Sequence, residues 1–214
     1  CKSLKHIIIP SSVTNICQYA FAQCESLSEI VIPSSVTSIK RSAFFESTSL
    51  VKVKISSSLT QLSESLFLGC KSLAQITIPS SVTKIENNVF SKCSKLENAT
   101  ISGCINYIGD SCFWLCLELK EIVIPGCSTV ICYDSFYRCE SLKNVTILEG
   151  ASLIGDGAFH SCINLLNIFI FEGVTSIESS AFNTCVRLKN ITIPNSVTFI
   201  GNSAFLDCVS LQNI

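Results

Sequence analysis

The chain of 214 residues contains no methionine, one tryptophan and two histidines. Charged residues make up only 14% of the sequence, and the net charge is −1. This weak charge gives no electrostatic basis for binding nucleic acid or an anionic membrane surface. No apolar run approaches the roughly 18 residues that a transmembrane helix needs. The longest apolar-rich stretch, Leu165–Phe171, is interrupted by Asn167.

Without methionine the chain also lacks the ordinary start residue, and it ends seven residues into a repeat. We therefore expect the sequence to be a fragment of a longer protein. In a fragment, the lack of a signal peptide gives no information about location.

What the sequence does contain is a 23-residue unit that repeats without insertion or deletion. Leucine at place four and phenylalanine at place 21 occur in every complete copy. The nine complete copies and one partial copy span residues 1–23, 24–46, 47–69, 70–92, 93–115, 116–138, 139–161, 162–184, 185–207 and 208–214. A fixed period of this length is typical of a solenoid, in which each coil contacts only its neighbours. We predict one continuous domain over residues 1–214.

Each unit has the pattern of two extended segments and a turn. Places seven and nine are apolar, which predicts a short strand with places six and eight facing outward. Proline follows at place ten in five repeats, where a strand should end; its replacements elsewhere are expected to soften the coil locally. The V-T-x-I segment at places 13 to 16 predicts a second extended piece. The Ala-Phe pair at places 20 and 21 predicts one helical or 3-10 turn, with phenylalanine and leucine as the core.

Stacking these units predicts a strand-dominated solenoid of α/β type. It has one parallel sheet, second short extended segments and short helical turns, and it curves with the strands inside.

Fourteen cysteines are present, and nine of them occupy the first place of the unit. Equivalent residues on adjacent coils lie about 4.8 Å apart with parallel Cβ directions, whereas a disulfide needs Cβ atoms about 3.8 Å apart. We therefore expect a column of buried, reduced thiols that act as small apolar groups. The other five cysteines are Cys17, Cys104, Cys112, Cys127 and Cys132. Cys104 and Cys127 share place twelve of adjacent repeats; free thiols are the favoured interpretation there, and a disulfide is the alternative.

The consensus C-x-x-L-x-x-I-x-I-P-x-S-V-T-x-I-G-x-x-A-F-x-x closely resembles the BspA-like leucine-rich repeat, over all nine complete units. The resemblance implies a curved, right-handed leucine-rich-repeat coil. Members of this family are typically surface or secreted proteins of host-associated bacteria and of mucosal or intestinal protists. Where studied, they are adhesins for extracellular-matrix or host-cell proteins. The family has no binding motif that transfers residue by residue.

Catalytic patterns are missing from the sequence. His6 and His160 lie about seven coils apart at different places of the unit, so they cannot meet. No nucleophile elbow, zinc-protease motif or phosphate-binding loop is present. Asp110 and Asp156 share a place, but Tyr133 stands between them and breaks any calcium-binding column. We expect no enzymatic activity, cofactor, metal or small-molecule substrate.

The outward strand places are the better candidates for binding. They mix amides, threonines and apolar groups, which suits a protein partner, and Phe169 is an aromatic anchor of the kind found at interface hot spots. The candidate partner-binding residues are Glu29, Val31, Glu121, Val123, Asn144, Thr146, Asn167, Phe169, Asn190 and Thr192. The alternative is that β propensity alone selects threonine and valine there.

Three N-x-T sequons fall on the same face, at Asn98, Asn144 and Asn190. Glycans on these residues would compete with adhesion, and the alternation of Asn and Thr also creates sequons by chance. The sequence thus predicts a non-enzymatic protein-binding module of a cell-surface or secreted protein. An intracellular scaffold with reduced core cysteines is the alternative, and an appendage of an enzyme is a third.

Overall fold

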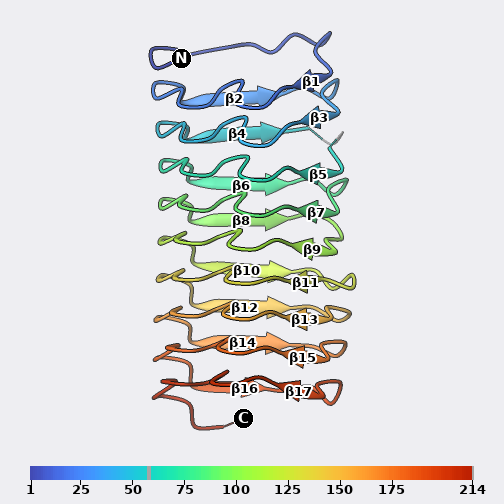
Figure 1. Ribbon diagram of the computed structural model, residues 1–214, viewed down its shortest axis with the longest axis vertical. Coiled ribbons are helices and arrows are strands. Elements are labelled where there is room, and N and C mark those ends of the chain that lie inside the picture. Colours follow the sequence, from blue (N-terminus) through green and yellow to red (C-terminus); the bar gives the residue numbers. More distant parts are fainter. Residues whose placement is uncertain (57–58, 214) are drawn as a thin grey trace.

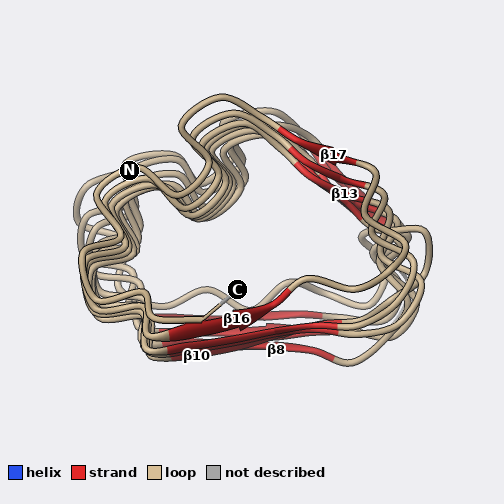
Figure 2. Ribbon diagram, turned by 90° about the horizontal axis from the view of Figure 1, so that it is seen from below, coloured by secondary structure: helices blue, strands red, loops and turns tan. Residues whose placement is uncertain are grey.

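The computed structural model describes residues 1–56 and 59–213, and these residues form a single stack of coils. The described residues contain strands and turns but no helix (Figure 1). Viewed down the stack, each coil traces a closed outline with one sheet on its long side and a second sheet on the opposite side (Figure 2). Successive coils overlap with small offsets in that view.

The long side of each coil contributes one strand to an eight-stranded parallel sheet, here called the strand face. Its strands are β2 (Glu29–Ile32), β4 (Lys52–Ile55), β6 (Gln75–Ile78), β8 (Asn98–Ile101), β10 (Glu121–Ile124), β12 (Asn144–Ile147), β14 (Asn167–Ile170) and β16 (Asn190–Thr192). Their outward and inward side chains alternate between exposed and buried, as the apolar alternation predicts.

The second extended segments also form parallel sheets, although the sequence predicted only one sheet. They are β1 (Asn15–Ile16), β3 (Ser38–Ile39), β5 (Gln61–Leu62), β7 (Lys84–Ile85), β9 (Tyr107–Ile108), β11 (Val130–Ile131), β13 (Leu153–Ile154), β15 (Ser176–Ile177) and β17 (Phe199–Ile200). β1 and β3 form a two-stranded sheet, and the other seven strands form a separate seven-stranded sheet. The single period brings these short segments into register from β5 to β17.

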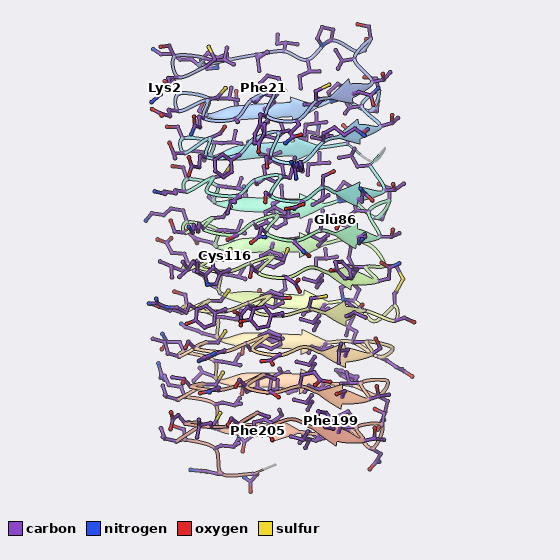
Figure 3. The ribbon with its side chains drawn as sticks, viewed as in Figure 1. Lys2, Phe21, Glu86, Cys116, Phe199 and Phe205 are labelled. Carbon is purple, nitrogen blue, oxygen red and sulfur yellow. A yellow bond between two sulfur atoms is a disulfide. The ribbon has the colours of Figure 1, made fainter. Side chains whose placement is uncertain are left out.

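The interior consists of the predicted phenylalanine and leucine columns. Seven phenylalanines, from Phe44 to Phe182, are fully buried, and successive rings stack with centroids 5.0 to 5.7 Å apart. Phe21 and Phe205 terminate this column near opposite ends of the stack (Figure 3). The place-four leucines from Leu27 to Leu188 are likewise fully buried. The predicted core is confirmed.

The predicted helical turn is wrong. Places 19 and 23 have positive φ in all nine complete repeats, for example 57° at Ser42 and 52° at Glu46. Left-handed residues at this spacing prevent a continuous helix. The amides at alternate places instead donate to the next coil: Phe44 N to Leu66 O at 3.0 Å and Glu46 N to Leu68 O at 2.8 Å. The turn is thus held by bonds between coils.

Apart from Cys1, which is exposed, the cysteine column is buried and reduced, as predicted. The thiols from Cys70 to Cys208 do more than fill space, because each donates a weak hydrogen bond to a phenylalanine carbonyl of the preceding coil. Cys116 Sγ lies 3.2 Å from Phe90 O, and the same contact recurs from Cys70 to Cys208. Ser47 occupies the same place and donates to Phe21 O at 2.7 Å, which explains why serine can replace cysteine here.

Cys104 and Cys127 form a disulfide, so the favoured interpretation of free thiols was wrong for this pair. Their Cα atoms lie 5.5 Å apart in adjacent coils, within the range that a disulfide spans. Both residues lie in turns after a strand, where the side chains are free to incline toward each other. The first-place thiols lack that freedom because they point in parallel into the core.

Proline at place ten determines how completely neighbouring strands pair. Where place ten carries Ser56, Ser102, Leu148 or Phe171, that coil's strand pairs with the preceding strand at four positions. Where it carries Pro79 or Pro125, only one pair forms, and three form at Pro194. No strand pair is present between β2, which precedes Pro33, and the described residues of the first coil.

The cause is the missing donor of proline. The amides of Ser102, Leu148 and Phe171 donate to the place-nine carbonyl of the preceding coil at 2.9 to 3.1 Å. Proline cannot make this bond, so the ladder stops earlier and leaves an open seam between two strands. The replacements of proline therefore close the sheet, and the expectation that they soften it was wrong.

Replacing Pro125 with serine should extend the pairing of β8 with β10. The new amide would donate to Ile101, and hydrogen exchange at the Val123 amide should slow roughly fivefold, which corresponds to about 1 kcal/mol for one hydrogen bond. Exchange measured by mass spectrometry or NMR tests this. Leu148→Pro is the reciprocal variant and should accelerate exchange between β10 and β12. Unchanged exchange at Val123 in Pro125→Ser would refute the role of the missing donor.

The buried thiols predict a loss of stability at alkaline pH. Burial raises the pKa of Cys70 from its ordinary value of 9.0 to about 12. Between these values the unfolded chain has lost a proton that the folded chain retains, so the free energy of unfolding falls as pH rises above 9. Denaturant unfolding at pH 7.5 and pH 10 under anaerobic conditions measures this fall. Cys70→Ser, which copies the natural serine at Ser47, should show a smaller fall than the unmodified protein; an equal fall would contradict the prediction.

Candidate functional site

The candidate binding residues all lie on the outer side of the strand face. The sheet register aligns them in two columns along the stack. In the first column Glu121 pairs with Asn144, Asn144 with Asn167 and Asn167 with Asn190. In the second column Val123, Thr146, Phe169 and Thr192 are aligned in the same way. Glu29 and Val31 lie on β2, near the other end of the stack.

The residues therefore form two groups, and the larger one contains an exposed apolar patch. Phe169 and Val123 are 56% and 53% exposed. The patch continues to Phe171 and Leu148, which are 50% and 39% exposed at place ten. The candidate set did not include these two residues, because place ten is where the pattern puts a strand-ending proline. The sequence did contain a signal for these two residues, because each is a large apolar residue at the place where the repeat usually has proline.

Charge is scarce on this part of the face. Among the outward side chains of β10, β12, β14 and β16, Glu121 is the one acidic residue, and none is basic. Several charged residues lie just before the strands: Lys95 pairs with Glu118 at 2.7 Å, Lys120 pairs with Glu97, and Lys143 and Lys189 are exposed beside β12 and β16. The Lys120 ammonium lowers the pKa of Glu97 by a hydrogen bond and by its charge. Contacts over β10 to β16 therefore depend on shape and hydrogen bonds.

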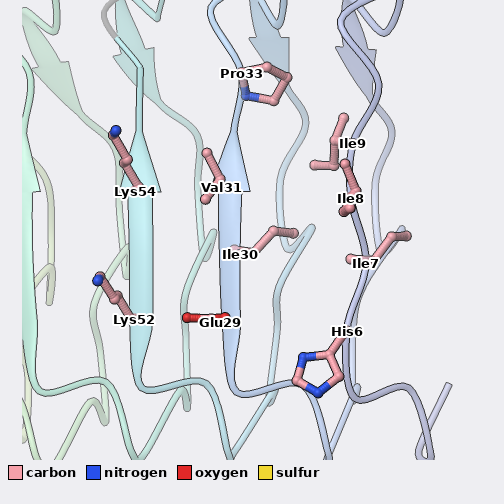
Figure 4. Close-up of a pocket in the computed structure, with 10 residues that line it drawn as sticks. All are labelled: His6, Ile7, Ile8, Ile9, Glu29, Ile30, Val31, Pro33, Lys52 and Lys54. Carbon is pink, nitrogen blue, oxygen red and sulfur yellow. The ribbon is translucent and has the colours of Figure 1, made fainter.

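The smaller group borders a hollow of about 380 Å³ between the first coil and β2 (Figure 4). Glu29, Ile30 and Val31 line one side of it, and His6 and Ile7 to Ile9 line the other. Lys52 and Lys54 of β4 complete the rim. This end of the strand face carries several charges, in contrast to the nearly uncharged surface of β10 to β16.

The place-six asparagines form part of an amide ladder. Asn167 Nδ2 donates to Asn144 Oδ1 at 2.9 Å, and Asn213 Nδ2 donates to Asn190 Oδ1 at 3.2 Å. All three sequon asparagines are exposed, so Asn98, Asn144 and Asn190 are accessible to a modifying enzyme. Their threonines at place eight lie on the same outer surface.

No catalytic constellation appears in the described part of the chain. His160 packs edge-on against the Tyr137 ring with centroids 5.0 Å apart, far along the stack from His6. Tyr107, Asn87 and Cys132 form a small polar cluster beside β9; burial is the largest cause that raises the pKa of both Tyr107 and Cys132. Both groups are therefore protonated at neutral pH. Residues 1–56 and 59–213 contain no group of three metal-binding side chains.

The same described residues also contain no helix long and apolar enough to cross a membrane.

Comparisons with solved structures agree with this architecture. A leucine-rich repeat protein from Bacteroides ovatus is 30% identical with a TM-score of 0.84; the match covers all of this chain and 61% of that one. The leucine-rich repeat protein of T. pallidum is 26% identical with a TM-score of 0.65, and the match covers 86% of this chain and 78% of that one. This chain thus spans less than two thirds of the Bacteroides protein in that structure. No protein with a curated description matches the sequence significantly.

The sequence itself matches a family model over its whole length. The model describes a "BspA type Leucine rich repeat region (6 copies)", and it matches residues 1–120 and 106–214. The repeat predicted from the cysteine, leucine and phenylalanine positions is the same unit that stacks in the structure. The chain belongs to the BspA-type leucine-rich repeat family.

Proposed function

We propose that this chain is a non-enzymatic protein-binding module of a cell-surface or secreted protein, which adheres to host or extracellular-matrix proteins through its strand face. One observation carries the proposal. The strands β10, β12 and β14 are paired at all four positions and display exposed apolar and amide side chains with almost no charge.

The physical basis is that such a surface costs little to desolvate and is already ordered. Val123, Leu148, Phe169 and Phe171 expose apolar side chains that water hydrates poorly. Contiguous exposed apolar patches on a folded protein mark sites of interaction. Phe169 is the proposed anchor because a large aromatic side chain near the centre of such a patch can dominate the binding energy.

The disulfide supports a surface or secreted setting, because disulfides persist in oxidising compartments. The Cys104–Cys127 bond joins two turns, and Cys104 is exposed to solvent. The alternative is an intracellular scaffold, which the nine buried free thiols also fit. Thiol counting on protein from its native source distinguishes the two: twelve free thiols support the first setting, and fourteen support the second.

Glycosylation of Asn98, Asn144 and Asn190 is a further part of the proposal. All three side chains are exposed on the strand face, and the sequon threonine follows on the same strand. Glycans at Asn144 and Asn190 would flank Phe169 and obstruct a protein partner. Adhesion through β10 to β16 therefore requires these two sites to be unoccupied, and peptide mass mapping of native protein reads their occupancy directly.

The adhesion proposal is tested by binding to immobilised laminin, collagen and fibronectin. Phe169→Ala should weaken binding roughly 30-fold, since loss of a hot spot costs about 2 kcal/mol or more. Glu121→Lys should weaken it as well, by placing a cation at the edge of the patch. Tyr133→Ala is the matched control, because Tyr133 is an aromatic residue 55% exposed outside the strand face.

Two outcomes would contradict this assignment. Binding that is unchanged in both strand-face variants would move the site elsewhere. Equal loss in Tyr133→Ala and Phe169→Ala would indicate a nonspecific effect of removing an exposed ring.

A further inference from the structure

The amide ladder of the strand face lacks one rung. Asn213 donates to Asn190, and Asn167 donates to Asn144, in the same direction along the stack. Within the described residues, Asn190 and Asn167 do not hydrogen-bond each other, although they are aligned Cα partners in β16 and β14. Asn190 Nδ2 is thus a free donor, and Asn167 Oδ1 is a free acceptor beside it.

A hollow occupies the place of the missing rung. It has a volume of about 160 Å³ and is lined by Asn167, Ile168, Phe169, Asn190, Ile191 and Thr192. Phe169 is 56% exposed beside the hollow and has no stacking partner among the described aromatic rings. The hollow therefore combines an aromatic ring, a hydroxyl group, a free amide donor and a free amide acceptor, without an ionised side chain.

The hollow lies over the paired part of these strands. β14 and β16 pair at three positions, and the six residues of those pairs are the ones that line the hollow. Hollows also lie between the first coil and β2 and between β8 and β10. Of these three hollows, the one between β14 and β16 alone has a phenylalanine ring in its lining.

We propose that the hollow between β14 and β16 binds one neutral sugar ring of a glycan. The free donor and acceptor match the two roles of a sugar hydroxyl, and adjacent hydroxyls can engage Asn190 and Asn167 together. The face of the Phe169 ring is partly negative, so it attracts the C–H groups on the apolar face of a pyranose. Thr192 supplies a further hydroxyl partner at the rim.

The chemistry disfavours other ligands. A carboxylate, phosphate or ammonium group would lose hydration without meeting an opposite charge, because every side chain in the lining is neutral. An extended peptide needs a row of backbone partners along a strand edge. β14 and β16 share three of their pairs, so most of that edge is already occupied. A compact ring with hydroxyl groups on its rim fits the remaining opening.

The test is an NMR titration of the unglycosylated 214-residue chain with methyl α-mannopyranoside, methyl β-galactopyranoside and N-acetylglucosamine. We expect saturable shifts of the side-chain amides of Asn167 and Asn190 with at least one sugar. Phe169→Ala and Asn190→Ala should each weaken binding at least tenfold. Asn98→Ala is the matched control, because Asn98 is an exposed place-six asparagine on β8, and it should bind like the unmodified chain.

The proposal is overturned if no sugar shifts these amides, or if Asn98→Ala weakens binding as much as Asn190→Ala. It is also overturned if N-acetylglycine methylamide, a peptide-bond mimic, shifts them while the sugars do not. The sugar-binding proposal and the adhesion proposal can fail independently. If the chain still binds the matrix proteins after their glycans have been removed enzymatically, the adhesion proposal stands, whatever the sugar titration shows.

Discussion

The hydrogen bonds between consecutive coils are the interaction on which this structure depends. A coil has too few residues to bury its own backbone and side chains, so each place must find its partner in an adjacent coil. A spacing of 23 residues stacks Phe113 on Phe136, and a spacing of 26 residues brings the Cys139 thiol to the Phe113 carbonyl. An unbroken period is what allows all of these columns to form together, because a single insertion would displace every column at once.

Because interior contacts repeat, the differences between coils are expressed at their edges and outer surfaces. Proline at place ten is one such difference. It has no backbone N–H to donate to the preceding coil, so it interrupts the hydrogen-bond ladder between neighbouring strands. The strand face is thereby divided into blocks. The block with β2 and β4 carries Glu29, Lys52 and Lys54, whereas the block from β10 to β14 carries Val123, Asn144 and Phe169. A uniform scaffold thus presents surfaces of different chemistry along its length.

The two proposed binding modes use different features of this face. Protein adhesion depends on the continuous apolar and amide surface of β10 to β14, which full pairing keeps flat and ordered. Sugar binding depends on the hollow beside it, where the amide ladder leaves a donor and an acceptor unused. Phe169 lies at the boundary and serves both. A glycan attached to Asn190 would block the hollow and also obstruct a protein partner at Phe169, so both modes require Asn190 to be unmodified.

The sequence alone determined the coil. The period, the alternation at places six to nine and the invariant Leu27 and Phe44 columns identified the strand face, the buried core and the family, because these depend on which side chains of one unit point inward. It did not determine the left-handed turn at Ser42, the Cys104–Cys127 bond, the seam at Pro125 or the unused amides of Asn167 and Asn190. Only the tertiary structure decided these, because each depends on how closely two coils approach and in which direction their donors point, and no pattern within a single unit contains that geometry.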